Sequence, residues 1–403
     1  MALDFDELFK VPMMGLWLMR THPYLKRTKI WFFQAFVVAG LFTLIVFIII
    51  YNIFYHDFVN RNFETLCKNT TLTLVWLMAA TQYSVMIIEQ KALLKLISHV
   101  KTDYQLLKYL DEKEQALVLK YSKEAEFICK YWFYIGSIAP QSFVVKSVGL
   151  MLYYYCIGEP QLVNYYELIY PKFIEDVKST NVIVFCLIYF LMIYYGYCSG
   201  IMFASFVPLG PTMMLHASGQ LEIVRKRIEE LFEELDDEVI LFKIKCIAKQ
   251  LKYIYRFGQR EFIKLLAIIL LNVFRIAYEV ALKVTTIILP ITSYEVLEAL
   301  ERGELSVEFF SFIIGGVLIS SSPCYFSDLL LEKGDNVRLA LYTCGWEQHY
   351  DSPRIRSNLL VLLICSRRPI AIRTLFKTMC LETLADLFQQ AYTIFNLMNA
   401  MLK

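Results

Sequence analysis

The stretch CLETLADLFQQAYTIFNLMNAMLK, from Cys380 to Lys403, is too apolar for a water-facing helix and too polar for a helix that meets only lipid. On a helix, alternating steps of four and three residues place small and polar side chains on one stripe, formed by Glu382, Asp386, Gln389, Thr393, Asn396, Ala400 and Lys403. The opposite faces carry Leu384, Leu387, Phe388, Ala391, Phe395, Met398 and Leu402. Polar groups inside a membrane normally face a protein interior or a water-filled cavity. The pattern predicts a pore-lining helix, and the alternative is a helix that packs against its neighbours through hydrogen bonds and small residues.

The composition of the 403-residue chain indicates a polytopic membrane protein, because 57% of the residues are hydrophobic and the mean hydropathy is +0.48. A formal net charge of +2 provides no overall field for nucleic acid. The histidines are dispersed, and the sequence contains no metal-ligand spacing, serine-nucleophile motif or phosphate-binding glycine loop. We therefore expect no metal, no cofactor and no enzyme activity. Among the cysteines, Cys67 and Cys156 are the one pair that an oxidising compartment could join, and this pairing stays open.

Seven segments are predicted to cross the membrane, since each is apolar over the length needed for about 30 Å of hydrocarbon. The charge-free run from Ser179 to Leu221 would be about 65 Å long as a helix, so we expect one helix that leaves the membrane and bends near Pro208. The charged blocks Glu89–Glu126 and Glu222–Glu261 predict helices outside the bilayer. The predicted crossings are Ile30–Tyr55, Asn69–Ile88, Tyr131–Tyr155, the run just described, Phe262–Thr292, Phe309–Ser327 and the terminal helix.

The distribution of basic residues predicts the orientation of these crossings. Twenty-eight lysines and arginines fall on the side of the amino terminus and six on the other side. The positive-inside tendency then places the amino terminus in the cytoplasm and the carboxyl terminus outside. The sequon at Asn69 falls on the outer side, so close to the membrane that its modification stays open.

The expected fold is all-α, a single seven-helix membrane domain over residues 1–403. It divides into a cytoplasmic segment at 1–29, helices 1–6 with cytoplasmic helical extensions at 30–330, and a segment at 331–403 that holds a cytoplasmic part and the pore-lining helix. A seven-helix transporter is an alternative with this topology, although its broken half-helices and repeat symmetry are not evident in the sequence.

Four short motifs resemble those of the insect odorant receptor family: HASGQLEIV at 216–224, ALYTCGWEQ at 340–348, RRPIAIRTLF at 367–376 and LFQQAYTIFNLM at 387–398. The resemblance covers nearly the whole chain. The chain departs from the common ending, because Thr393 stands where a serine usually follows the tyrosine. The Gln-Phe ending of gustatory receptors is absent, with Asn399 and Ala400 in that vicinity, which favours an odour-tuned, ligand-binding subunit over a gustatory-type channel.

This resemblance implies an odorant-gated, non-selective cation channel in the plasma membrane of sensory-neuron dendrites. In the family, four subunits form a tetramer in which the last helices surround a central pore and a cytoplasmic anchor makes most of the subunit contacts. The implied partners are a shared odorant co-receptor subunit, a small volatile organic ligand, membrane lipid and the permeating cations.

The family's narrow gate consists of two hydrophobic side chains one turn apart near the outer end of the last helix. Alignment through the motif at Thr393 assigns it to Leu397 and Met401, with Ala400 beside them, whereas alignment from the chain end assigns it to Met398 and Leu402. Such a ring closes by excluding water. Asn396 and Asn399 are the nearest polar candidates for a hydrated lining. Lower down, Glu382 or Asp386 could form a cation-attracting ring or be salt-bridged at the helix base.

The family's odour site lies in the outer half of helices two, three, four and six. The corresponding residues here are Leu72, Val75, Trp76, Ala79, Val145, Lys146, Gly149, Leu152, Tyr153, Phe185, Ile188, Tyr189, Phe309, Phe312, Ile313 and Gly316. A pocket of this kind binds a volatile by burying its apolar surface. Lys146 carries the most specific single-residue prediction. Its charge faces the pocket or a water-filled vestibule, or alternatively it snorkels or pairs with an acidic neighbour.

Overall fold

Nearly all of the chain is helical in a computed structural model that describes residues 5–166, 168–170, 172–233, 236–255, 266–303, 306–348, 352–367 and 371–402. The α-helices are α1 (Phe5–Leu8), α2 (Lys10–Leu18), α3 (Lys29–Asn52), α4 (Phe63–Ile88), α5 (Gln90–Leu106), α6 (Glu112–Ile157), α7 (Lys172–Thr180), α8 (Val182–Phe206), α9 (Leu209–Glu229), α10 (Asp237–Tyr255), α11 (Leu266–Glu301), α12 (Val307–Thr343), α13 (Pro353–Ser366) and α14 (Leu381–Leu402). In these ranges the only β-structure is an isolated bridge between Arg373 and Thr378, which confirms the all-α fold.

Six helical stretches in the described part of the chain are long and apolar enough to span a membrane: Lys29–Asp57, Phe63–Ile88, Glu112–Ile157, Val182–Glu229, Phe274–Glu301 and Val307–Thr343. They overlap the first six predicted crossings, and residues 262–265 of the fifth lie outside the described residues. The seventh is α14, whose polar stripe makes it less apolar than the others. At 22 residues, α14 is about 33 Å long and still sufficient for one crossing.

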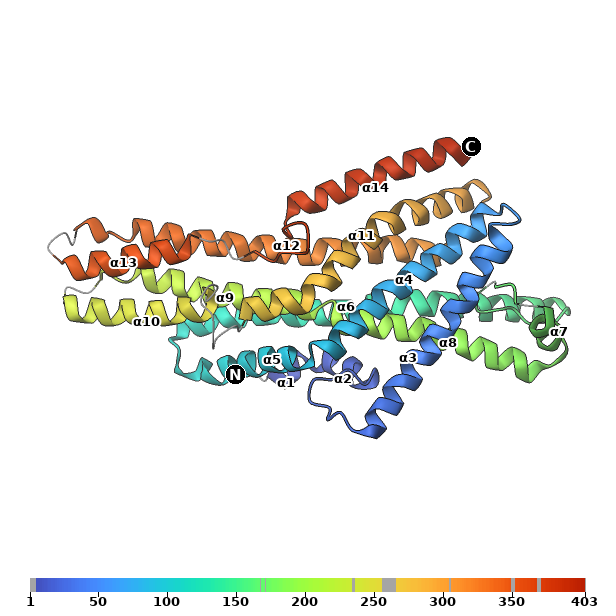
Figure 1. Cartoon of the computed structure of the whole chain (residues 1–403), viewed down its shortest axis with the longest axis horizontal. Helices are drawn as coiled ribbons and strands as arrows, with labels where there is room; N and C mark the ends of the chain where they lie inside the picture. The colour runs from blue at the N-terminus through green and yellow to red at the C-terminus, as the bar shows by residue number, and fades with distance from the viewer. Residues whose placement is uncertain are drawn as a thin grey trace.

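The molecule is elongated, and its long helices run along much of its length (Figure 1). One end, which we call the distal lobe, consists of α10, α13 and the C-terminal halves of α9 and α12. At the opposite end lie α7 and the C-terminal ends of α3, α6, α11 and α14. The carboxyl terminus therefore lies far from the distal lobe, whereas the amino-terminal helices lie near the middle of the molecule.

The charge-free run from Ser179 forms two consecutive helices, α8 and α9, which meet at Val207 and Pro208. This confirms the predicted long helix with a bend at Pro208. Every residue from Leu209 to Gly219 is buried, because α9 packs between α6 and α12 as the central helix of the molecule. A helix that is enclosed on all sides needs an apolar sequence even where it lies outside the bilayer.

The block Glu89–Glu126 is helical, as the sequence predicts, and it contains a break between two helices. α5 ends at Leu106, a short 3-10 turn follows, and α6 begins at Glu112. Acidic residues in the first turn of α6, Glu112 and Glu114, favour a new helix start there because they complement the positive end of the helix dipole. Glu114 also accepts two hydrogen bonds from the guanidinium of Arg227, at 2.6 and 2.9 Å, and so joins α6 to α9.

Two helices begin at other positions than the sequence suggested. α4 starts at Phe63 rather than Asn69, since the side chain of Asn62 caps it by accepting a bond from the Thr65 N–H. The sequence places the start of the terminal helix near the basic residues Arg367, Arg368 and Arg373, whereas α14 starts at Leu381, because residues 372–379 form a small hairpin in which the Met379 N–H donates to the Ile372 carbonyl. The cysteines Cys67 and Cys156 are both free thiols.

Asn69 is 2% exposed, and its amide group is fully engaged. Its nitrogen donates to Asp57 at 2.6 Å, and its oxygen accepts a hydrogen bond from the Tyr166 hydroxyl at 3.2 Å. Asp57 is itself buried and accepts a further bond from Thr65 at 2.9 Å. A glycan on Asn69 would have to break this buried network, so the sequon serves a structural role in the folded chain.

Candidate functional site

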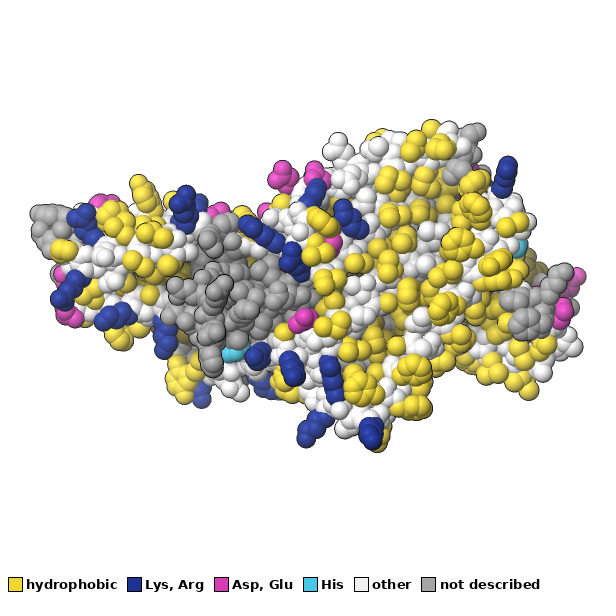
Figure 2. All heavy atoms as spheres, in the orientation of Figure 1, with side chains coloured by type: hydrophobic (Ala, Val, Ile, Leu, Met, Phe, Trp, Pro, Cys, Tyr) yellow, Lys and Arg dark blue, Asp and Glu magenta, His cyan; other side chains and the backbone are white. Residues whose placement is uncertain are grey.

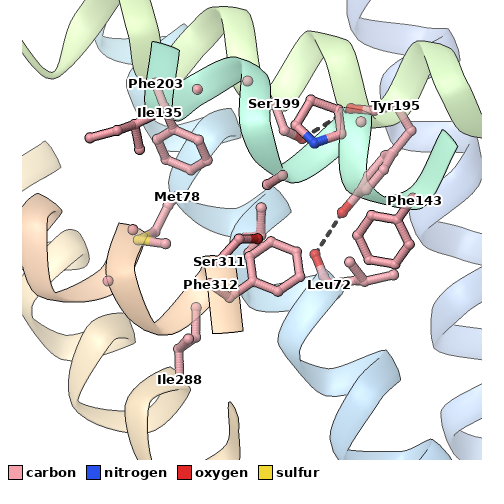
Figure 3. A pocket seen from close by; sticks show the side chains of 18 of the residues that line it. Leu72, Met78, Ile135, Phe143, Tyr195, Ser199, Phe203, Ile288, Ser311 and Phe312 are labelled. Carbon is pink, nitrogen blue, oxygen red and sulfur yellow. Dashed lines mark hydrogen bonds between the residues drawn. The ribbon is translucent and has the colours of Figure 1, made fainter. Parts of the chain in front are cut away.

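A cavity of about 90 Å³ lies inside the helix bundle, between α4, α6, α8, α11 and α12. Figure 3 shows side chains from different sides of the bundle, such as Phe203 of α8 and Ile288 of α11, around this space, which we call the inner cavity. Its lining is mostly apolar and aromatic, and consists of Leu72, Val75, Met78, Trp132, Ile135, Gly136, Ala139, Pro140, Phe143, Tyr165, Tyr166, Met192, Tyr195, Gly196, Ser199, Gly200, Phe203, Ile288, Ser311, Phe312, Gly315, Gly316 and Ile319.

One wall of the inner cavity is a direct backbone contact between α6 and α8. A Cβ atom on Gly200 would lie 2.2 Å from the Gly136 carbonyl oxygen, and a Cβ atom on Gly136 would lie 2.6 Å from the Gly200 carbonyl oxygen. Only glycine fits at both positions, as is common where membrane helices approach closely. Pro140 has no N–H, so the Gly136 carbonyl lacks its usual helical donor and is free to face the Gly200 backbone.

Three hydroxyl groups around the inner cavity donate to backbone carbonyl oxygens. Tyr195 donates to the Leu72 carbonyl at 2.6 Å, Ser199 to the Tyr195 carbonyl at 3.1 Å, and Tyr165 to the Pro140 carbonyl at 3.1 Å. Burial raises the pKa of Tyr165, so its hydroxyl stays neutral. With their protons engaged in this way, these oxygens can offer only acceptor positions to a ligand.

The segment between α6 and α7 folds back into the bundle rather than projecting away from it. Its side chains Tyr165, Tyr166, Leu168 and Tyr170 are all buried. Tyr165 and Tyr166, together with Phe143 of α6, separate the inner cavity from a second space of about 90 Å³, the outer cavity. The outer cavity is more polar and is lined by Thr65, Lys68, Asn69, Phe143, Lys146, Ser147, Leu150, Val163, Asn164, Tyr165, Tyr166, Arg302, Ser306, Glu308 and Phe309.

The residues expected to bind ligand fall into three groups in the structure. Leu72, Val75, Phe312 and Gly316 line the inner cavity, and Lys146 and Phe309 line the outer cavity. On α6, the exposed side includes Val145, Gly149, Leu152 and Tyr153. The remaining residues pack between helices instead of lining either cavity, and these are Trp76, Ala79, Phe185, Ile188, Tyr189 and Ile313.

Most of the cavity-lining residues that sequence reasoning missed lie deeper on the same helices, whereas Tyr165 and Tyr166 come from the segment between α6 and α7 and Ile288 comes from α11. On α6 they run from Trp132 to Phe143, and on α8 from Met192 to Phe203. Each stretch begins within one turn of the residues that were expected and extends about three turns further along the helix. The available signal was the group of small and helix-distorting residues Gly136, Pro140, Gly196 and Gly200, which marks where two membrane helices approach and where space can remain beside them.

Lys146 forms an ion pair with Glu308, which joins α6 to the first turn of α12. The Glu308 side chain is 5% exposed, whereas the Lys146 side chain is 56% exposed. Lys146 therefore pairs with an acidic neighbour at the edge of the outer cavity. Pairing of this kind was one of the alternatives that the sequence left open.

We expect Lys146→Met to reduce the amount of folded protein, because it leaves the buried Glu308 carboxylate without its cation at a cost on the order of 2 kcal/mol. The double variant Lys146→Met/Glu308→Gln removes that charge and should regain most of the loss. Surface biotinylation of cells expressing the three chains measures the effect. Equal surface amounts for the single and double variants would contradict this role for the pair.

The terminal helix α14 packs along α11 and α12. The side chains that contact them are the apolar ones expected on the opposite faces of the predicted stripe: Leu384, Leu387, Phe388, Ala391, Phe395 and Met398 are buried or half-buried. The stripe itself is exposed, from Glu382 through Asp386, Gln389, Thr393 and Asn396 to Ala400. The side chains of Leu402 and Lys403 lie outside the described residues.

The two alignments of the gate place it on different faces of α14. Leu397 and Met401 are 59% and 76% exposed and lie on the side of the polar stripe, with Ala400 between them. Met398 and Asn399 are half-buried and turned toward the rest of the subunit. At the base of the helix, Asp386 forms an ion pair with Lys377 at 2.6 Å. Both partners are about half exposed, so this pair is a weak contact.

Three comparisons relate the chain to known proteins. The family model described as "7tm Odorant receptor" matches residues 62–392. Odorant receptor 56a of Drosophila melanogaster is 26% identical over 195 residues, which are 47% of this chain and 46% of that protein, so the match spans about half the length of that relative. The structure of the olfactory receptor OR5 from Machilis hrabei superposes with a TM-score of 0.71 at 16% identity, covering 98% of this chain and 99% of that chain. The same receptor in complex with eugenol gives a TM-score of 0.71 at 15% identity, covering 98% and 100%.

Proposed function

Because the chain belongs to the odorant receptor family of insects, we propose that it is the ligand-binding subunit of an odorant-gated, non-selective cation channel. Family membership makes it a multi-pass protein of the plasma membrane and not an enzyme. It also favours an odour receptor over the gustatory-type channel and over a transporter unrelated to odour.

The observation that supports a channel most strongly is the exposed polar stripe on α14. A helix of this length at membrane depth exposes Gln389, Thr393 and Asn396 on one face while its apolar side chains pack inward. Polar side chains of this kind are costly against hydrocarbon, so the stripe needs a neighbour that is wet or polar. Four such helices around an axis would supply one, with Leu397 and Met401 forming a hydrophobic constriction at the outer end of the same face.

The inner cavity is the proposed odorant site. Its volume of about 90 Å³ is smaller than the roughly 150 Å³ of an engineered apolar cavity that holds benzene. A ligand of one ring with a short substituent would therefore have to displace wall side chains such as Phe143 or Tyr165. Apolar burial at about 25 cal/mol per Å² would supply most of the binding free energy, and the hydroxyl oxygens would accept a hydrogen bond from an alcohol or phenol.

Two helices contact both the inner cavity and α14, and they can transmit the effect of ligand binding to the pore. Ile288 of α11 and Phe312 of α12 line the inner cavity, and both helices pack against α14. A ligand that enlarges the cavity would favour the arrangement in which α11 and α12 move outward, and α14 would follow. The ligand shifts this equilibrium only by its difference in affinity for the closed and open arrangements.

The proposed orientation has the amino terminus and the distal lobe in the cytoplasm. Lys and Arg side chains gather between the distal lobe and the large apolar face (Figure 2), as the positive-inside tendency predicts for the cytoplasmic boundary of the membrane. The proposed assembly is a tetramer with a shared odorant co-receptor subunit, which binds a small volatile and conducts cations.

Filling the inner cavity should weaken the response to odorants. Gly315 lines the cavity, and a Cβ atom added there would meet no heavy atom within 4 Å. We expect Gly315→Val to occupy ligand space and to raise the half-maximal ligand concentration by about tenfold or more, which corresponds to about 1.4 kcal/mol. Current recording from cells that express the chain with a co-receptor, challenged with a panel of volatiles, measures the shift.

Gly40→Val is the matched control for this experiment, because Gly40 is an exposed glycine of α3 whose Cβ would also meet nothing within 4 Å. Its response should equal that of the unaltered chain. An unchanged response in Gly315→Val would remove the inner cavity from the odorant site. The absence of any ligand-evoked current from the unaltered chain with its co-receptor would contradict the proposed function itself.

A further inference from the structure

A narrow groove of about 50 Å³ lies on the outer surface of the helix bundle, beneath the amino-terminal helix α2. Met14 and Leu18 of α2 form one side, and Phe133 and Ser137 of α6 and Ile201 of α8 form the other. Gly15 allows α2 to lie directly on α8, since a Cβ atom there would lie 1.9 Å from the Ser205 hydroxyl oxygen. The groove is thus an apolar slot in the membrane-spanning part of the chain, where lipid is the surrounding solvent.

The groove is located near the end of the membrane-spanning region that faces the distal lobe. Ser137 lies near the start of the apolar half of α6, and Ile201 lies near the end of α8. The side chains Met14, Trp17 and Leu18 of α2 are half exposed. The Arg20 guanidinium lies over the Trp17 ring, 5.1 Å from its centroid. Tryptophan and arginine together are typical of the interface between lipid headgroups and acyl chains.

Positive charge gathers around Arg20 and the start of α3, a region that we call the corner. No acidic residue nearby in the sequence neutralises this charge. No acidic residue occurs between Glu7 and Asp57, whereas this interval contains Lys10, Arg20, Lys26, Arg27 and Lys29. Arg27 donates to the Gln90 side chain at 2.7 Å, which joins the corner to α5. Lys26 and Lys29 are exposed beside the start of α3, and Figure 2 shows basic side chains near this edge of the apolar face.

We propose that this corner is a binding site for one anionic phospholipid. A short segment of one acyl chain occupies the groove under α2, the rest of that chain lies along the surface of the bundle in the bilayer, and the acidic headgroup lies against Arg20, Lys26 and Lys29. Apolar burial would hold the chain, and charge would select the headgroup, since a basic residue near the membrane surface favours an anionic lipid. In the orientation proposed above, this lipid belongs to the cytoplasmic leaflet.

The site has a direct structural link to the inner cavity. Gly136 and Gly200 line both spaces, the groove on one side of the α6–α8 contact and the inner cavity on the other. A bound acyl chain would therefore contact the α6–α8 wall from the groove side, while a ligand in the inner cavity would contact the same wall from the other side.

The test uses the full chain inserted into vesicles of phosphatidylcholine with roughly one-fifth phosphatidylserine, extracted in mild detergent, with the retained lipids counted by mass spectrometry. We expect the ratio of phosphatidylserine to phosphatidylcholine among the retained lipids to be about fivefold the ratio in the vesicle, the size that one basic residue near the surface can produce. In Arg20→Gln/Lys26→Gln/Lys29→Gln the enrichment should fall to the vesicle ratio. The matched control is Lys245→Gln/Lys249→Gln, at two exposed lysines of α10 in the distal lobe, and it should retain the enrichment.

A second variant tests the groove independently of charge. Ser137→Phe fills the groove from the exposed side of α6 and should lower the retained lipid by about one molecule per chain. Ile138→Phe, at a residue that is 51% exposed and does not line the groove, should leave it unchanged. Equal lipid retention in Ser137→Phe and Ile138→Phe, or unchanged phosphatidylserine enrichment in the triple variant, would overturn the proposal. The measurement involves no odorant and no current, so its failure would leave the proposed channel function standing.

Discussion

Gly200→Ala is expected to destabilise the protein by about 3 kcal/mol, at the upper end of the cost of overpacking a core. The reason lies in the α6–α8 contact, where the new Cβ atom would be 2.2 Å from the Gly136 carbonyl oxygen and 3.2 Å from the Gly136 carbonyl carbon. Both atoms belong to the backbone, so no side-chain rotation can relieve the clash, and α6 must move away from α8. Thermal unfolding of the purified chain in detergent, together with its amount at the cell surface, measures the loss.

Gly40→Ala is the control for this substitution, because the same methyl group meets nothing within 4 Å on α3. It should leave the unfolding temperature unchanged or slightly raised, as alanine favours a helix over glycine. If Gly200→Ala unfolds at the same temperature as Gly40→Ala, the close contact between α6 and α8 is not present in the folded protein.

Leu397→Asn is expected to produce a current without any ligand, at least about tenfold above that of the unaltered channel, which corresponds to about 1.4 kcal/mol in the equilibrium between closed and open pores. A hydrophobic ring closes a pore by excluding water, and an amide at the same place retains water. Leu397 lies on the exposed face of α14 beside Thr393 and Asn396, which is the face that would meet the other subunits around the axis.

Two further substitutions separate the alternative alignments of the gate. Leu397→Val keeps the ring apolar and should keep the channel closed at rest. Met398→Asn places an amide against α11 and α12, because Met398 is half-buried on the packing face, so it should reduce the amount of protein without a resting current. A resting current from Met398→Asn and none from Leu397→Asn would transfer the gate to the alignment that ends at Leu402.

The fold was largely predictable from the sequence because it depends on the lengths and periodicity of apolar segments. The charge-free run after Ser179 required a helix longer than a bilayer, and the structure explains it by the complete burial of residues 209–219 of α9. The polar stripe of α14 was also predictable from the sequence, since spacing along one helix fixes which side chains share a face. The break between α5 and α6 was missed because the apolar spacing continues on both sides of it.

The position of the inner cavity was not predictable in the same way. A cavity depends on where separate helices approach one another, and spacing within one helix does not contain that information. The contact between Gly136 and Gly200 sets the depth of the cavity on α6 and α8. Tyr165 and Tyr166 reach it from a polar-looking segment between helices, which composition alone would leave at the surface.

The proposed water-filled pore along α14 is tested most directly by the reactivity of single cysteines placed on its two faces. Thr393→Cys lies on the exposed stripe, and Ala391→Cys lies on the buried face against α11 and α12. A charged thiol reagent applied while an odorant holds the channel open should change the current through Thr393→Cys channels and leave Ala391→Cys channels and the unaltered channel as they were. If Thr393→Cys stays unmodified, or if Ala391→Cys reacts equally fast, α14 does not line the path of the ions.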